Sequence, residues 1–278
     1  MALGCHIREG GPMDYEHLIY AKEEGIATIT INRPQKLNAF TSAMYQGLSE
    51  IIDDVARDDG VRVLVITGTG RAFCVGADVK GLEQGLPKRP QPYAQPKPSA
   101  DAVSKILTVP LQRMDKPVIA AINGIAAGGG LDTACACDIR IASERATFSS
   151  VFVRRGLLPT MGGTYFLPRL IGIDKACELI WTGDLIDAWE AERIGLVTRV
   201  VPHEELKAAT EELTTKLIKG PPLAIARAKK VIYDGLNMDL ESALRDIMRE
   251  YTALSQTEDH REALRAFLEK REPVFKGR

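Results

Sequence analysis

The chain has 278 residues, of which 45% are hydrophobic and 26% charged, a composition typical of a globular protein of one or two domains. Its 36 basic and 37 acidic residues give a formal net charge of -1, so no overall field would attract nucleic acid or an anionic membrane. No apolar run approaches the roughly 20 residues of a membrane span, and residues 1–13 lack the apolar stretch of a targeting signal. We therefore expect a cytoplasmic protein without nucleic-acid or membrane partners.

The five cysteines indicate a reducing compartment, because their number is odd and the chain is long. Cys135 and Cys137 form a C-x-C pair, but no second Cys or His pair lies at the spacing of a metal site. We expect no metal ion, and we expect the cysteines to pack as small apolar side chains.

The first half of the chain alternates predicted strands and helices, which is typical of βαβ units and a largely parallel sheet. Alternating β-branched residues predict a strand over 26–31, and Thr41 is placed to cap a helix that continues to about Arg57. Further buried strands are predicted over 61–67, 118–122 and 139–142.

The remaining segments are a loop and a series of helices. Residues 83–100 are rich in Pro, Gln and Lys, which predicts a loop that is either a lid over a site or a surface insertion. From residue 174 onward the periodicity predicts helices without a partner sheet, as a helical appendage or an assembly surface. They cover 174–181, 188–194, 203–218, 223–233, 240–255 and 259–270.

Two glycine-bearing turns, at residues 67–80 and 122–134, each follow a buried strand and are predicted to lead into a helix. Backbone N–H groups are free at such places, and open α/β sheets bind ligands there. A dinucleotide site is weakly indicated, because Phe73 replaces the third glycine of the motif that Gly68 and Gly70 would begin. The sequence contains neither a P-loop nor the G-x-S-x-G element of serine hydrolases.

Longer strings resemble the enoyl-CoA hydratase/isomerase, or crotonase, family, in the family's order from about Tyr20 to the C-terminus. They are RAFCVGADVK at 71–80, KPVIAAING at 116–124, AGGGLD at 127–132, ACDIR at 136–140, LPTMGGT at 158–164, NRP at 32–34, LNA at 37–39 and FLEKR at 267–271. The resemblance implies an α/β fold: a crotonase-like spiral of repeated ββα units with a C-terminal helical trimerisation region, in a homo-trimer or a hexamer. It divides the chain into an N-terminal extension (1–17), an α/β core (18–200) and a helical assembly region (201–278).

The resemblance also implies an acyl-CoA substrate whose thioester oxygen accepts hydrogen bonds from the backbone N–H groups of Ala77 and Gly129. A thioester that becomes an enolate concentrates charge on this oxygen, and one preorganised donor can contribute about 3–4 kcal/mol. Asp78, Val79 and Gly128 belong to the same motifs and are expected to line the substrate site.

Asp132 lies three residues after Gly129, and by resemblance it occupies the place of one of two catalytic glutamates of the hydratases. The other glutamate is replaced by Phe152, which cannot activate water, although the phenylalanine could equally be a core residue. Thr160 stands where some isomerases carry an aspartate. Asp132 is therefore the only carboxylate at a catalytic position of the motifs, with a structural aspartate in the first helical turn as the alternative.

CoA phosphates require cations, and the resemblance assigns this role to Lys80 and to Lys270 with Phe267, often from a neighbouring subunit; Arg33 is a weaker candidate. We expect no cofactor beyond CoA as part of the substrate. The expected protein is an acyl-CoA enzyme of the kind found in fatty-acid metabolism. It is either an isomerase or an atypical hydratase. Such a hydratase would act on a cyclic substrate or take its second carboxylate from outside the motifs. The alternative is a catalytically silent CoA-binding or RNA-associated protein of the same fold.

Overall fold

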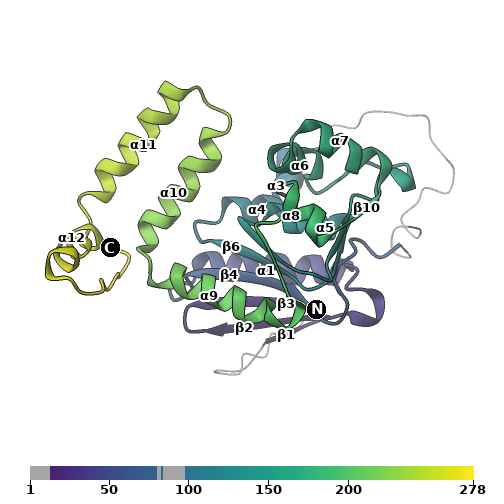
Figure 1. Ribbon diagram of the computed structural model, residues 1–278, viewed down its shortest axis with the longest axis horizontal. Coiled ribbons are helices and arrows are strands. Elements are labelled where there is room, and N and C mark those ends of the chain that lie inside the picture. Colours follow the sequence, from purple (N-terminus) through teal and green to yellow (C-terminus); the bar gives the residue numbers. More distant parts are fainter. Residues whose placement is uncertain (1–12, 80–82, 84–97) are drawn as a thin grey trace.

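The computed structural model of the protein describes residues 13–79, 83 and 98–278 (Figure 1). Two β-sheets and a group of helices make up the body of the molecule, and the last three helices extend to one side of it (Figure 1). Lys80 and most of the Pro-rich segment predicted as a loop lie outside the described residues.

The larger sheet has seven strands in the order β1-β2-β3-β4-β6-β8-β11. These are β1 (Met13–Tyr15), β2 (Leu18–Glu23), β3 (Ile26–Ile31), β4 (Val63–Gly68), β6 (Val118–Ile122), β8 (Ile139–Ser143) and β11 (Arg199–Val201). β1, β2 and β3 are antiparallel neighbours, whereas the other neighbouring strands are parallel. The predicted strands β3 and β6 are confirmed at both ends, and β8 and β4 are confirmed within two residues.

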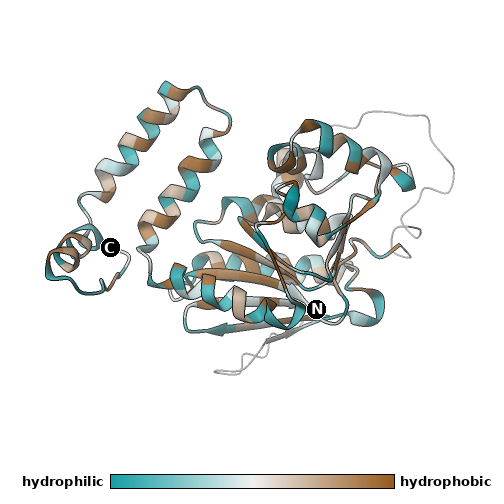
Figure 2. Cartoon of the chain, viewed as in Figure 1, coloured by the Kyte–Doolittle hydropathy of each residue, from teal (hydrophilic) through white to brown (hydrophobic). Residues whose placement is uncertain are grey.

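Helices cover both faces of this sheet. Helix α1 (Ser42–Arg57) packs on one face and α9 (Leu206–Lys219) on the other (Figure 1). Leu64 and Ile66 of β4 belong to the core under α1, whereas Val63 and Val65 belong to the core under α9. Because both faces are buried, the central strands are continuous apolar runs (Figure 2). The predicted cap of α1 is confirmed, since the N–H of Met44 donates to Thr41 Oγ1 at 3.2 Å.

The smaller sheet has four short strands in the order β10-β9-β7-β5, which are β5 (Ala72–Cys74), β7 (Ile125–Ala127), β9 (Thr147–Ser149) and β10 (Leu185–Asp187). Each of β4, β6 and β8 is followed by one of these short strands. Each glycine turn first contains a short strand, β5 or β7, which the sequence did not predict. The second turn then enters a helix at Gly129, as predicted. The two turns also pack together, since a Cβ on Gly124 would lie 2.2 Å from the carbonyl oxygen of Arg71.

The body also contains short helices and 3-10 turns. They are α3 (Ala100–Ser104), α4 (Thr108–Arg113), α5 (Gly129–Ala136), α6 (Gly163–Ile171), α7 (Ile173–Thr182), α8 (Ala188–Arg193), η1 (Pro34–Lys36), η2 (Val153–Arg155) and η3 (His203–Glu205). The prediction of helices without a partner sheet beyond residue 174 is wrong, because β10 pairs with β9 and β11 pairs with β8. Strands of three residues are too short for sequence alternation to reveal.

The C-terminal helices α10 (Pro222–Gly235), α11 (Leu240–Leu254) and α12 (Glu258–Glu269) extend away from the sheets (Figure 1). α11 and α12 expose large apolar side chains in the single chain: Leu240, Leu244, Ile247, Met248, Tyr251, Leu264, Phe267 and Leu268. No helix of the described residues is long and apolar enough to cross a bilayer.

A buried ion pair joins α10 to the body. Lys229 Nζ lies 2.8 Å from Asp138 Oδ2 and donates to the carbonyl oxygen of Lys116 at 3.0 Å. Asp138 also accepts hydrogen bonds from the hydroxyl of Tyr233, at 2.8 Å, and from the N–H of Val118, at 2.7 Å. Because both charges are hydrogen-bonded, this pair can be buried and can fix the direction in which the C-terminal helices leave the body.

Replacing Lys229 with Met should lower the free energy of unfolding by about 3–5 kcal/mol, because Asp138 would remain as a buried charge without its cation. Urea denaturation would measure the loss. The matched control is Lys230→Ala, which removes a half-exposed lysine on the same helix that pairs with Asp234, and which should cost less than about 1 kcal/mol. Equal effects of the two substitutions would contradict the anchoring role of Lys229.

Candidate active site

Two loops from separate strand turns meet backbone to backbone at one end of the sheets. Gly76 has a φ of +84°, and a Cβ on it would lie 2.8 Å from the backbone nitrogen of Gly129. A Cβ on Gly130 would lie 2.1 Å from the carbonyl oxygen of Cys74. Only glycine permits this approach, so the glycines set the distance between the loop after β5 and the first turn of α5.

The backbone of Phe40 orients Ala77. The N–H of Phe40 donates to the carbonyl oxygen of Gly76 at 2.8 Å, and the N–H of Asp78 donates to the carbonyl oxygen of Phe40 at 2.9 Å. In such a parallel bridge the N–H of the middle residue, Ala77, points away from Phe40. Among the described residues no backbone acceptor receives the N–H of Ala77 or of Gly129, the first residue of α5. These two donors are therefore available to an oxygen atom of a ligand.

Asp78 and Arg33 hold the same loop. Arg33 Nη1 donates to Asp78 Oδ2 at 2.7 Å and to the carbonyl oxygen of Ala39 at 3.1 Å. Both side chains are mostly buried in this contact. The sequence assigned Asp78 to the substrate and Arg33 to the CoA phosphates, whereas the structure engages them with each other beside Ala77.

Helix α5 is fixed at its C-terminal end by Arg140. This buried guanidinium donates to the carbonyl oxygen of Cys137 at 2.5 Å and to that of Leu196 at 2.8 Å. A cation at a helix C-terminus interacts favourably with the helix dipole. Arg140 thus ties the far end of α5 to the chain ahead of β11, while the free N–H groups lie at the other end.

Asp132 is completely buried in the first turn of α5. Its Oδ2 accepts a hydrogen bond from the N–H of Met161 at 3.1 Å, whereas Oδ1 has no hydrogen-bond partner among the described residues. Burial raises the pKa of this carboxyl group to about 7, although the N–H groups of Met161 and Gly163 oppose the shift. A carboxyl group with such a pKa can both accept and release a proton near neutral pH.

The loop after β9 forms another wall beside α5. Phe152 is half-buried and outside the main core, and its ring edge lies 3.9 Å from the position that a Cβ on Gly128 would take. The structure therefore places Phe152 beside the turn at Gly128 rather than in the core. Thr160 and Val79 are both exposed.

Comparisons with known proteins identify the family and the fold. The family described as enoyl-CoA hydratase/isomerase matches residues 21–278. The chain belongs to this family. A crystal structure of an enoyl-CoA hydratase from Bacillus anthracis superposes with a TM-score of 0.86 at 35% identity, covering 95% of this chain and 100% of that one. The crotonase fold is thereby confirmed.

Two curated relatives are equally similar but differ in reaction. The short-chain-enoyl-CoA hydratase of Clostridium acetobutylicum is 36% identical, over 96% of this chain and 100% of that protein. The 1,2-epoxyphenylacetyl-CoA isomerase of Escherichia coli is also 36% identical, over 95% of this chain and 99% of that protein. The protein is an enzyme of hydratase/isomerase type that acts on acyl-CoA thioesters, and identity does not choose between the two reactions.

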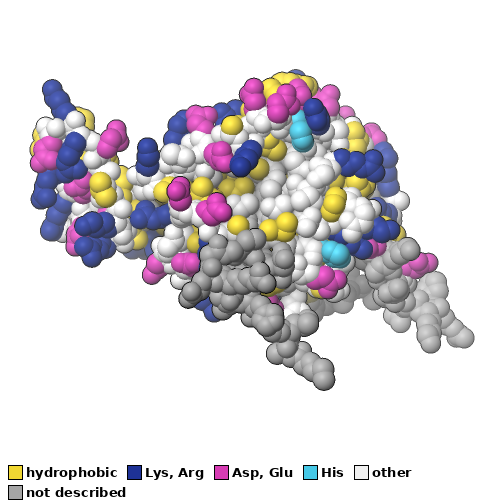
Figure 3. All heavy atoms as spheres, turned by 90° about the horizontal axis from the view of Figure 1, so that it is seen from below, with side chains coloured by type: hydrophobic (Ala, Val, Ile, Leu, Met, Phe, Trp, Pro, Cys, Tyr) yellow, Lys and Arg dark blue, Asp and Glu magenta, His cyan; other side chains and the backbone are white. Residues whose placement is uncertain are grey.

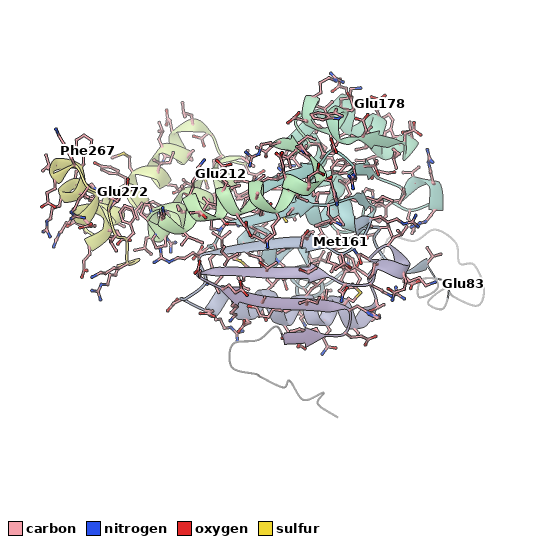
Figure 4. The ribbon with its side chains drawn as sticks, turned by 60° about the horizontal axis from the view of Figure 1, so that its bottom comes forward. Glu83, Met161, Glu178, Glu212, Phe267 and Glu272 are labelled. Carbon is pink, nitrogen blue, oxygen red and sulfur yellow. The ribbon has the colours of Figure 1, made fainter. Side chains whose placement is uncertain are left out.

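Two sequence-predicted residues lie away from the loops described above. Phe267 is 81% exposed on α12, and Lys270 follows at the end of this helix with a φ of +55°. In Figure 4, Phe267 lies at the tip of the C-terminal helices, far from Met161 in the body of the molecule. A single chain therefore does not bring Phe267 and Lys270 to Asp132.

Sequence reasoning missed Tyr45 and Met161. The hydroxyl of Tyr45 donates to Met161 Sδ at 3.4 Å, and both atoms lie near Gly129. Tyr45 directly follows Met44, one of the buried residues of α1. A tyrosine amid that apolar pattern was the available signal, but helical periodicity alone does not show which loop faces it.

Asp132→Asn should change how stability depends on pH. Between about pH 4 and pH 7 the unfolded carboxyl group ionises while the folded one keeps its proton, so wild-type stability falls as pH rises. Asparagine does not ionise, so the variant lacks this pH dependence. The difference in unfolding free energy, variant minus wild type, should grow by roughly 3–4 kcal/mol between about pH 4 and pH 8. Asp101→Asn, at an exposed carboxylate, should run parallel to wild type; parallel curves for Asp132→Asn would refute the burial effect.

Gly163→Ala should displace the carboxylate, because the new Cβ would lie 2.3 Å from Asp132 Oδ1. We expect turnover of an enoyl-CoA thioester to fall by about 10²-fold or more, as for other misplaced catalytic groups. Gly235→Ala is the control, since its nearest neighbour would be 4.0 Å away, and it should retain activity. Unchanged turnover in Gly163→Ala would show that the position of Asp132 is not critical.

Proposed function

We propose that the protein is an isomerase of unsaturated acyl-CoA thioesters that uses Asp132 as its single proton carrier. The observation that carries the proposal is the combination of a buried carboxyl group beside Gly129, with its pKa raised to about 7, and an aromatic residue, Phe152, at the second catalytic position of the hydratase motif. A proton shuttle needs one group that can hold and return a proton, whereas hydration also needs a group that activates water.

The first step removes a proton from carbon. The thioester oxygen accepts hydrogen bonds from the N–H groups of Ala77 and Gly129, and the carboxylate of Asp132 takes a proton from a carbon of the acyl chain. The electron pair of the broken C–H bond moves into the conjugated system, and the negative charge develops on the thioester oxygen. The two fixed donors and the N-terminus of α5 stabilise this charge.

The second step returns the proton. Asp132, now protonated, delivers the proton to a different carbon, so the double bond moves while the composition of the substrate stays constant. Phe152 lines the turn and offers no group that could orient water for attack. The sequence of steps needs no metal or redox cofactor, because the thioester itself acidifies the neighbouring carbon.

The CoA portion requires cations, and the end of the chain supplies them. Figure 3 shows Lys and Arg side chains gathered at the end of the molecule formed by the C-terminal helices. The exposed members include Arg261, Arg265, Lys270 and Lys276. Since Phe267 and Lys270 lie far from the same chain's Asp132, we propose that they contact CoA bound to a neighbouring subunit of a homo-trimer or hexamer, together with Lys80.

The test is a mass-spectrometric assay of straight-chain and cyclic enoyl- and dienoyl-CoA substrates in H₂O and in D₂O. Deuterium uptake or a moved double bond at constant composition is expected, and Asp132→Asn should lower this rate by about 10²–10⁴-fold. A gain of water by the wild type would instead identify a hydratase. Binding without any change of mass or double-bond position would leave a silent CoA-binding protein.

Two further measurements sharpen the result. Because the ionised carboxylate starts the reaction, kcat/KM should rise with pH through about 7 and be about tenfold lower at pH 6 than on its plateau. Phe152→Glu restores a second carboxylate at a half-buried position and should raise hydration by about tenfold or more over wild type. An unchanged hydration rate in this variant would argue against Phe152 as the residue that decides the reaction.

A further inference from the structure

One polar side chain beside the oxyanion turn has no assigned role. Tyr45 lies on α1 and is partly buried against the main core, with its ring centroid 5.0 Å from that of Phe40. Its hydroxyl lies 3.6 Å from the position that a Cβ on Gly129 would take. A phenylalanine would fill the same space among the apolar neighbours, so the hydroxyl requires its own explanation.

The protein partner of this hydroxyl is a weak one. Tyr45 donates to Met161 Sδ at 3.4 Å, and a thioether sulfur is a poor acceptor compared with an oxygen atom. The same sulfur would lie 3.0 Å from a Cβ on Gly129. The hydroxyl of Tyr45 could therefore exchange Met161 Sδ for a better acceptor at little cost in free energy. It lies next to Gly129, the first residue of α5.

The direction of α5 places the hydroxyl of Tyr45 on the same side as the N–H of Gly129. In an α-helix the Cα–Cβ bonds tilt toward the N-terminus, which is also where the free N–H groups point. A hydroxyl beside the Cβ position of Gly129 thus lies on the side to which the N–H of Gly129 is directed. Burial raises the pKa of Tyr45, so the hydroxyl keeps its proton and acts as a donor.

We propose that the hydroxyl of Tyr45 is a third donor to the thioester oxygen, acting beside the N–H groups of Ala77 and Gly129. On substrate binding it leaves Met161 Sδ and donates to the oxygen on which the enolate charge develops. This inference rests on the proposed function for its catalytic consequence, but not for its effect on a bound thioester. The hydrogen bond strengthens as charge accumulates on the oxygen, so Tyr45 should affect kcat more than KM.

The test combines a spectrum with a rate. Donors to the carbonyl oxygen of a conjugated thioester shift its absorption to longer wavelength, so bound cinnamoyl-CoA reports the hydrogen bonds directly. Tyr45→Phe should reduce this shift by a third or more, both in the wild-type protein and in Asp132→Asn. It should also lower kcat for deuterium exchange by about 10–10²-fold while KM changes less than about threefold.

The control variant is Tyr233→Phe, which removes the hydrogen bond to Asp138 in the anchor of α10. It should lower stability without altering the spectral shift. Replacement of Tyr45 by 3-fluorotyrosine, whose hydroxyl is more acidic, should enlarge the shift, and it keeps the test decisive if Tyr45→Phe does not fold.

The outcomes separate the two proposals. An unchanged spectrum and exchange rate in Tyr45→Phe, or an equal loss in Tyr233→Phe, overturns the role of Tyr45. A spectral shift that depends on Tyr45 in a wild-type protein that exchanges no substrate hydrogen supports Tyr45 as a donor and rejects the isomerase. Exchange by the wild type, with both the rate and the spectrum insensitive to Tyr45→Phe, keeps the isomerase and rejects the donor.

Discussion

The backbone contact between the loop after β5 and the first turn of α5 is the constraint on which the site depends. Gly76 and Gly130 allow it, because any side chain at either position would collide with the backbone of the opposite segment. This contact brings together two segments from distant parts of the sequence, and in the described part of the chain no backbone acceptor receives the N–H of Ala77 or of Gly129. Such donors are most effective when their positions are fixed before the substrate arrives. Two contacts fix the loop after β5, namely the bridge from Ala77 to Phe40 and the ion pair between Arg33 and Asp78. Arg140 fixes the C-terminal end of α5.

The proposed proton carrier, Asp132, is buried at a cost to the fold. Asp132 has one oxygen without a partner among the described residues and no adjacent cation, in contrast to Asp138, which six residues later pairs with Lys229 and Tyr233. The two aspartates are close in sequence but have different surroundings. Asp138 pairs with Lys229 and holds the C-terminal helices, whereas burial raises the pKa of Asp132 to about 7. This difference separates the acid–base group from the structural one.

The sequence predicted the long elements of the fold because their periodicity extends over many residues. β3, β6 and α1 fall at their predicted positions, and the family resemblance led to Ala77, Gly129 and Asp132 through their motifs. The three-residue strands β1, β5, β7, β9, β10 and β11 were missed, since three residues carry no measurable alternation. The six-residue strand β2 was missed as well. The pairing of Arg33 with Asp78 and the approach of Tyr45 to Gly129 depend on tertiary packing, which no local pattern encodes. The distance of Phe267 from Met161 likewise became visible only in three dimensions (Figure 4).

All eight residues of α5 are buried, and most of them are Gly, Ala, Cys or Thr. Because no larger side chain fits there, this wall of the site cannot be remodelled by single substitutions. The loop after β9 differs: the segment from Val153 to Leu158 is exposed, and Phe152 beside it is half-buried. If α5 binds the enolate as proposed, the acceptable acyl groups can change over evolutionary time through the loop after β9 while α5 stays constant. Because α5 is enclosed, substitutions that change thioester binding are rarely tolerated, whereas substitutions that change the space for the acyl chain are tolerated more readily.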